Sequence, residues 1–185
     1  MCGIAGLAGR FPPGTIGAMS ALLARRGPDD HGVFEDREAG IAFAHRRLSI
    51  IDLSPAGHQP MADGSGRYTI CYNGEIYNYR ELRAELVARG RNLRGHSDTE
   101  VILELFADHG PAVFARLNGI FALAIWDAVE RRLWLARDGM GVKPLYLAET
   151  ATGLAFASEL KALLAVPGLD RTIDRVAVAA YLGYL

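Results

Sequence analysis

A cysteine stands directly behind the initiator methionine, in the stretch Met1-Cys2-Gly3-Ile4. Once Met1 is removed, Cys2 carries a thiol and a free α-amine on the same residue. A thiol with a pKa of about 8.5 needs a base to become a nucleophile at neutral pH, whereas an α-amine with a pKa of about 7.7–8.0 is neutral enough there to accept a proton. The first residues therefore pair a nucleophile with its own candidate base, although a cysteine at a strand start is also an ordinary small apolar residue.

A second candidate segment is Asn73-Gly74-Glu75, directly after an apolar run at 68–72 that predicts a strand. Asn73 offers a side-chain N–H, and Gly74 lets a backbone N–H approach a ligand because it has no Cβ. Together they predict the two donors of an oxyanion hole. The alternative is a hairpin turn, which Asn-Gly often forms, but the following residues 79–89 have helical rather than strand spacing.

Two charged residues have the chemistry to hold an amino acid. Arg47 follows a predicted strand at 41–45, and its guanidinium can grip a carboxylate through two parallel hydrogen bonds. The alternative is a solvated surface arginine. Asp98 follows Ser97 at a predicted helix start, where a carboxylate caps backbone N–H groups or binds a ligand. Both readings stay open for each residue.

Alternating groups of strands and helices must position these residues. Apolar periodicity and turn signals predict strands at 2–7, 41–45, 68–72, 120–126, 133–137, 144–147 and 154–157, and helices at 15–25, 79–89, 97–110, 158–164 and 173–185. The strands from 120 to 157 are expected to form two hairpins, and almost wholly apolar strands indicate sheets covered on both faces. The pattern predicts an α+β fold.

Composition restricts the class of protein. The 185 residues are 50% hydrophobic, with a net charge of −1, which favours a globular domain and no nucleic-acid partner. No apolar run is long enough to span a bilayer, and no signal segment is seen, so no membrane partner and a cytoplasmic location are expected. Two cysteines and scattered histidines give no metal-ligand spacing, so no metal is expected.

Six motifs in this order resemble one known family. They are Cys2–Gly6, Arg26–Asp29, His45–Ile50, Tyr72–Asn78, Ser97–Val101 and Ala136–Tyr146. Together they resemble the glutaminase domain of class II glutamine amidotransferases, and most of all that of glutamine-hydrolysing asparagine synthetases. The resemblance extends from Cys2 to about Lys161.

The resemblance implies an N-terminal-nucleophile hydrolase fold, a four-layer αββα sandwich of two antiparallel sheets. It implies that Cys2 attacks the side-chain amide of L-glutamine, and that Asn73 and Gly74 stabilise the oxyanion. Arg47 would hold the α-carboxylate, with Glu75 and Asp98 at the α-ammonium group. The implied glutamine-binding set is Arg47, Leu48, Ser49, Ile50, Ile51, Asn73, Gly74, Glu75 and Asp98.

The resemblance also implies partners. Residues 1–165 would form the glutaminase domain, and residues 166–185 a linker or the start of a truncated synthetase domain, because the family's Ser-Gly-Gly-x-Asp-Ser phosphate loop does not occur here. The glutaminase domain needs no cofactor, whereas ATP and Mg²⁺ belong to an ATP-dependent synthetase domain acting in cis or in trans. A homodimer is a further candidate. The alternatives are an ammonia acceptor other than aspartate (a sugar phosphate, a phosphoribosyl compound or a polysaccharide-associated acid) and a non-catalytic glutamine-binding module.

Overall fold

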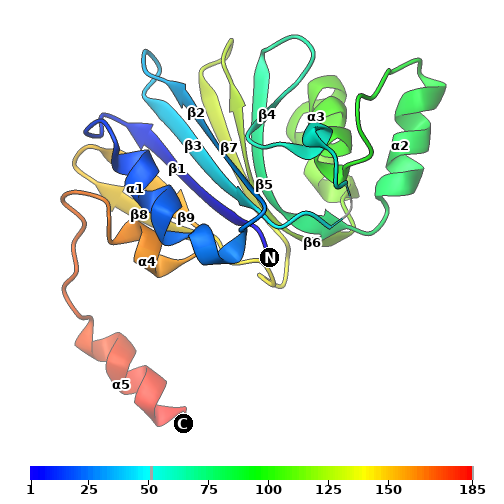
Figure 1. Cartoon of the computed structure of the whole chain (residues 1–185). Coiled ribbons are helices and arrows are strands. Elements are labelled where there is room, and N and C mark those ends of the chain that lie inside the picture. Colours follow the sequence, from blue (N-terminus) through cyan, green and yellow to red (C-terminus); the bar gives the residue numbers. More distant parts are fainter. Residues whose placement is uncertain (51, 185) are drawn as a thin grey trace.

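Two antiparallel sheets packed face to face, with helices on their outer faces, form the body of the protein (Figure 1). The computed structural model describes residues 1–50 and 52–184. The strands are β1 Gly3–Gly9, β2 Asp30–Asp36, β3 Ile41–Arg47, β4 Met61–Ala62, β5 Tyr68–Ile76, β6 Gly119–Asp127, β7 Arg132–Arg137, β8 Tyr146–Thr150 and β9 Gly153–Ala157. The α-helices are α1 Thr15–Leu22, α2 Tyr79–Ala88, α3 Asp98–His109, α4 Leu160–Leu163 and α5 Arg175–Gly183, and the 3-10 turns are Ala24–Arg26, Pro55–Gly57 and Gly110–Arg116.

The first sheet has the strand order β2-β3-β1-β9-β8, with the N-terminal strand β1 at its centre. Strand β1 pairs with β3 from Gly3 opposite Arg46 onwards, and with β9 on its other side. Helices α1 and α4 cover the outer face of this sheet (Figure 1). Their apolar side chains, such as Met19 and Leu163, pack with the small residues of β1 and β9 in one buried cluster. The start of the chain is therefore held by a strand on each side.

The second sheet has the order β4-β5-β6-β7 and is covered by α2 and α3 (Figure 1). The side chains of α3 that face it, including Ile102 and Phe106, are buried in one cluster with Leu86 of α2 and Leu123 of β6. This packing fixes the first turn of α3 against β5. The resulting position of Asp98 beside β5 matters for the site described below.

The inner faces of the two sheets meet in a third apolar cluster that includes Phe43, Cys71 and Phe156. The rings of Phe43 and Phe156 pack edge to face with centroids 5.8 Å apart. A Cβ on Gly6 would overlap the Phe156 ring, so only glycine lets this ring lie on β1. Helices, two sheets and helices again make four layers, which confirms the expected αββα sandwich.

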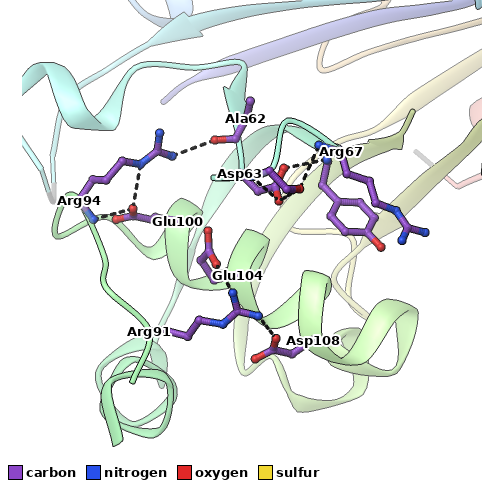
Figure 2. A network of polar contacts seen from close by, with 10 residues as sticks. Ala62, Asp63, Arg67, Arg91, Arg94, Glu100, Glu104 and Asp108 are labelled. Carbon is purple, nitrogen blue, oxygen red and sulfur yellow. Dashed lines mark hydrogen bonds and ion pairs between the residues drawn. The ribbon is translucent and has the colours of Figure 1, made fainter. Parts of the chain in front are cut away.

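Figure 2 shows a polar network along the flank of α3 that faces β4 and residues 91–94, here called the outer side of α3. Arg94 bonds the carboxylate of Glu100 (3.3 Å) and the carbonyl of Ala62 (2.8 Å). Arg91 lies 3.7 Å from Glu104 and also pairs with Asp108. These contacts tie the segment before α3 to the helix itself and to β4.

The predicted hairpins β6–β7 and β8–β9 are confirmed, and three other expectations need correction. The polar segment Asp30–Asp36 forms the edge strand β2, which its sequence did not predict because only Val33 and Phe34 are large and apolar. Strand β8 runs from Tyr146 to Thr150 rather than over 144–147. Strand β5 continues through Asn73-Gly74 to Ile76 instead of ending at Tyr72, because nine of its residues pair with β6.

Helix α5 differs from the rest of the chain because it makes little contact with the body (Figure 1). Its residues are exposed, including apolar ones such as Val176 and Leu182. By contrast, Val166 is still buried in the cluster under α1 and α4. Among the described helices, none has the length and apolar character needed to cross a bilayer.

Candidate active site

The thiol of Cys2 lies at the start of the central strand of the first sheet, one residue before β1 begins. Its Sγ lies 3.3 Å from the backbone N of Leu48, which donates to it, and 3.5 Å from the carbonyl oxygen of the same residue. The carbonyl oxygen of Cys2 accepts a 2.7 Å hydrogen bond from Nε of Arg26. Arg26 in turn pairs with Glu159 at 3.1 Å. Cys2 is therefore fixed through both its side chain and its backbone.

A pocket of about 110 Å³ opens beside this thiol. It is lined by residues from the N-terminus, the loop after β3, strand β5 and the start of α3: Met1, Cys2, Arg47, Leu48, Ile50, Asp52, Gly57, Gln59, Tyr72, Asn73, Gly74, Glu75, Ser97, Asp98, Thr99 and Lys143. Residues far from Cys2 in the sequence, such as Gly74, Asp98 and Lys143, thus share one small cavity with it. The two sheets bring them together because β1 and β5 lie on facing sheets.

Strand β5 presents every second backbone N–H to this pocket. The N–H of Tyr72 donates to Gln59 Oε1 (2.7 Å) and that of Ile76 to Asp98 Oδ2 (3.1 Å), so both point away from β6. Gly74 lies between them and pairs with Phe121, whose own N and O bond Asp138 on the opposite side. Because N–H directions alternate along a strand, the N–H of Gly74 also points away from β6, towards the pocket.

Asn73 supplies a second donor at the same position of β5. Its Nδ2 is buried and has no hydrogen-bond partner among the residues that the structure describes. A buried amide N–H without a partner costs about 1–3 kcal/mol, so such a group in a pocket indicates a ligand. Gly74 cannot carry a side chain here, since a Cβ would overlap Ile120 and Phe121 of β6. The turn interpretation of Asn-Gly is wrong, because both residues lie within a strand.

Arg47 is buried, with 8% of its surface exposed, so the surface interpretation is wrong. Its Nη1 donates to the carbonyl of Ser54 (3.1 Å) and its Nη2 to the carbonyl of Asp52. Gly57 packs directly against the guanidinium, and a Cβ there would overlap it. Two bonds to carbonyls leave other N–H groups of the fork for a ligand. The positive charge is thus held in place without a carboxylate partner among the described residues.

Asp98 is the first residue of α3 and is almost fully buried. Its Oδ2 accepts hydrogen bonds from the hydroxyl of Tyr72 (2.7 Å) and the N–H of Ile76 (3.1 Å). Burial raises the pKa of Asp98, while these hydrogen bonds act in the opposite direction. Ser97, not Asp98, caps the helix, because its side chain accepts from the N–H of Glu100. The carboxylate of Asp98 is therefore available to the pocket.

His45 lies behind the pocket and is neutral. Burial is the main cause that lowers the pKa of His45 to about 4, and the nearby Arg47 acts in the same direction. Its Nε2 is 3.0 Å from the carbonyl oxygen of Tyr72, so the proton of the neutral ring is on Nε2. His45 thereby fixes the backbone of β5 from the first sheet.

Most of the predicted site residues meet in this pocket, and the exceptions are specific. Cys2, Arg47, Leu48, Ile50, Asn73, Gly74, Glu75 and Asp98 all line it. Ser49 does not, and its N–H donates instead to Asp29 (2.8 Å). Ile51 lies outside the described residues. Sequence reasoning missed Tyr72, Gln59, Thr99 and Lys143, although Tyr72 and Thr99 stand directly beside predicted site residues.

Two other features do not belong to this site. A larger open pocket of about 610 Å³ lies at the far end of β1, between segments 9–14 and 35–42, and contains none of the predicted site residues. Within residues 1–50 and 52–184, no three His, Cys, Asp or Glu side chains are grouped closely enough to hold a metal ion.

Comparison with known proteins identifies relatives over the whole chain. The family model described as Glutamine amidotransferase domain matches residues 1–185. Asparagine synthetase [glutamine-hydrolyzing] 3 of Bacillus subtilis is 40% identical over 171 residues, which cover 91% of this chain and 27% of that protein. The putative asparagine synthetase [glutamine-hydrolyzing] of Mycobacterium bovis is 42% identical, covering 97% and 29%. The chain thus spans less than a third of the length of these curated relatives.

A solved structure supports the fold. The glutamine phosphoribosylpyrophosphate amidotransferase of B. subtilis matches with a TM-score of 0.74 over 94% of this chain and 45% of that one. The identity is 20%, so the match shows a shared fold and nothing about the substrate.

Proposed function

The chain belongs to the family of glutamine amidotransferase domains, and from this premise we propose that its pocket hydrolyses L-glutamine to L-glutamate and ammonia. The observation that supports this most directly is the pairing of donors on β5. The orphaned Nδ2 of Asn73 and the outward N–H of Gly74 line the same small pocket as the thiol of Cys2.

The proposed reaction begins with the removal of Met1, which frees the α-amine of Cys2. The amine takes the thiol proton, and the sulfur attacks the side-chain amide carbon of glutamine. Charge develops on the former carbonyl oxygen, where Asn73 and Gly74 donate hydrogen bonds. The C–N bond then breaks, the nitrogen takes the proton from the amine and leaves as ammonia. Water hydrolyses the remaining thioester, releasing glutamate and restoring the thiol.

The charges around the pocket suit a zwitterionic substrate. Arg47 supplies a buried cation for the α-carboxylate, and its bonds to loop carbonyls hold the guanidinium in one orientation. Asp98 and the more exposed Glu75 supply the opposite charge for the α-ammonium group. Leu48 and Ile50, from the loop after β3, form the wall near the thiol.

The central test compares the wild type with Cys2→Ala after Met1 removal has been verified by intact mass. Ammonia and glutamate release should be lost in Cys2→Ala, and Asn73→Ala should reduce kcat by about 10²–10³-fold, as removal of one oxyanion donor does elsewhere. Equal release by wild type and Cys2→Ala would reject the nucleophile. If Met1 is retained and glutamine binds without glutamate release, the chain is a glutamine-binding module.

We further propose that the ammonia is used for the ATP-dependent amidation of aspartate. The support is that relatives about 40% identical are asparagine synthetases. ATP and Mg²⁺ would then belong to a synthetase domain acting in cis or in trans, residues 1–165 would form the glutaminase domain, and 166–185 the linker. Incubation with purified synthetase domain, aspartate and ATP tests this, because another acceptor class would yield no asparagine.

Three finer expectations remain proposals. A free nucleophilic thiol needs a reducing compartment, which favours the cytoplasm, and fractionation of the native host tests this. A homodimer is testable by sedimentation. The expectation that the domain itself needs no cofactor is tested by glutaminase activity after dialysis against EDTA.

A further inference from the structure

Among the described pocket residues of β5, Tyr72 is the one whose side chain bonds a predicted ligand of the substrate. Its hydroxyl donates to Asp98 Oδ2 at 2.7 Å, and only 3% of the residue is exposed. Its backbone is fixed as well, because its N–H donates to Gln59 and its carbonyl accepts from His45. A side chain held at so many points can fix the group that it touches.

We propose that Tyr72 is a positioning residue, which holds the carboxylate of Asp98 for the α-ammonium group and so makes the pocket select α-amino acids. The inference rests on the proposed glutaminase function and assigns a role to a residue that does not itself carry out the chemistry.

The chemistry of the phenol explains why this partner suits a binding carboxylate. A tyrosine hydroxyl satisfies one oxygen of Asp98 without cancelling its charge. A lysine or arginine would cancel it, and within the described part of the chain no such side chain pairs with Asp98. The negative charge therefore stays uncompensated until a cation enters the pocket. An ammonium group is the cation that glutamine brings.

The geometry of β5 links the two ends of the proposed substrate. Tyr72 and Asn73 are adjacent, and their side chains point to opposite faces of the sheet. One contacts Asp98 below α3, and the other offers Nδ2 to the region of the thiol. Any movement of Tyr72 would thus shift the ammonium site relative to the oxyanion site.

The experiment compares two reagents that alkylate Cys2 in the Met1-processed protein, monitored by intact mass. The diazoketone analogue of L-glutamine carries the α-ammonium group, whereas iodoacetamide does not. In Tyr72→Phe, the second-order rate of labelling by the glutamine analogue should fall about tenfold, the effect of losing one hydrogen bond to a charged group. The rate with iodoacetamide should be unchanged.

Tyr68→Phe is the matched control. Tyr68 lies on the same strand and in the same apolar cluster, but its hydroxyl has no hydrogen bond to the described residues. Both labelling rates should equal those of the wild type. Equal rates for Tyr72→Phe and Tyr68→Phe with the glutamine analogue would overturn the proposal. A parallel loss with both reagents would also overturn it, because Tyr72 would then act on the thiol or on the fold.

A double-mutant cycle tests whether Tyr72 acts through Asp98. In Asp98→Asn the buried charge is gone, so adding Tyr72→Phe should cause no further loss of labelling by the glutamine analogue. A further tenfold loss would show that Tyr72 acts through another group. A wild type that releases no ammonia from glutamine would instead reject the proposed function, which separates the two failures.

Discussion

Asp98 and Glu100 are two carboxylates on the first turn of α3, and they have opposite kinds of partners. Glu100 has donors on both oxygens: the backbone N–H groups of Arg94 (2.7 Å) and Gly95 (2.8 Å) and the guanidinium of Arg94. Asp98 has a phenol and one N–H of β5, and no cation among the described residues. One carboxylate is neutralised by its partners, and the other keeps its charge for the pocket.

The same contrast extends to the regions around these two residues. On the outer side of α3, arginines pair with acids in the network of Figure 2. On the pocket side, the described partners of Arg47 are carbonyl oxygens, and Asn73 keeps a buried N–H without a described partner. Charges and donors that are matched stabilise a fold, whereas those that are left unmatched in a cavity indicate where a ligand binds.

The largest effect is expected from Asp98→Asn, which removes the carboxylate that has no cationic partner among the described residues. Loss of one partner of a buried ion pair costs about 3–5 kcal/mol, so kcat/KM for glutamine should fall a hundredfold or more. Burial raises the pKa of Asp98, so its ionised form is less favourable in the folded chain than in the unfolded chain and does not add to stability. The midpoint of thermal unfolding should therefore not decrease. A lower midpoint of unfolding together with unchanged activity would show that Asp98 stabilises the fold and does not bind the substrate.

A smaller effect concerns the neutral His45 behind the pocket. Its pKa is lowered to about 4 from 6.5, so the unfolded chain takes up this proton first as the pH falls. The contribution of neutral His45 to the free energy of unfolding is complete above about pH 6.5. It is lost as the pH falls from about 6.5 to 4 and amounts to about 3 kcal/mol. Urea unfolding at several pH values measures this. The unfolding free energy of His45→Gln should depend less on pH in this range than that of the wild type. The same slope in both proteins would show that His45 is not the group responsible.

Gly57→Ala should disturb the cationic end of the pocket. A Cβ at this position overlaps the guanidinium of Arg47, and overpacking of this kind costs about 1–3 kcal/mol. The KM for glutamine should rise about tenfold or more. Gly64→Ala is the matched control, because a Cβ on Gly64 meets no atom within 4 Å. Equal KM values for the two variants would show that Arg47 does not hold the substrate.

The smallest effect is expected on the outer side, from Arg94→Ala. Its guanidinium is largely exposed, and such ion pairs contribute about 0–1 kcal/mol. The two backbone N–H donors to Glu100 remain in the variant. Unfolding free energy should fall by less than about 1 kcal/mol, with unchanged glutaminase kinetics. A large loss of activity would mean that the two sides of α3 are coupled.

The sequence allowed prediction of the layers and of most of the residues that line the candidate site, because both depend on local patterns. Apolar periodicity marked the central strands, and motif order marked Cys2, Arg47, Asn73 and Asp98. Strand β2 was missed because an edge strand needs few apolar residues, and its pairing with β3 is a non-local property. Whether Arg47 was buried also depended on a loop that folds over it from residues 52 to 57.

The supporting residues of the site were harder to predict. Tyr72 has the apolar face and β propensity of a core residue, and nothing in its neighbours shows that its hydroxyl reaches a residue 26 positions further on. Gln59 likewise acts through a contact with the backbone of β5 that only the folded loop creates. Ligand-binding groups carry a chemical signature in the sequence, whereas the groups that orient them are recognised from their three-dimensional contacts.

The outer edge of β5 has a consequence for how binding is observed. Amides of Tyr72, Gly74 and Ile76 recur along it at about 7 Å intervals, and side-chain oxygens of Gln59 and Asp98 take the first and the last. A substrate oxygen on the middle amide would continue this series as an added rung of the sheet. Hydrogen–deuterium exchange at Gly74 should therefore slow when glutamine or a stable analogue binds, giving a readout of occupancy that does not require turnover.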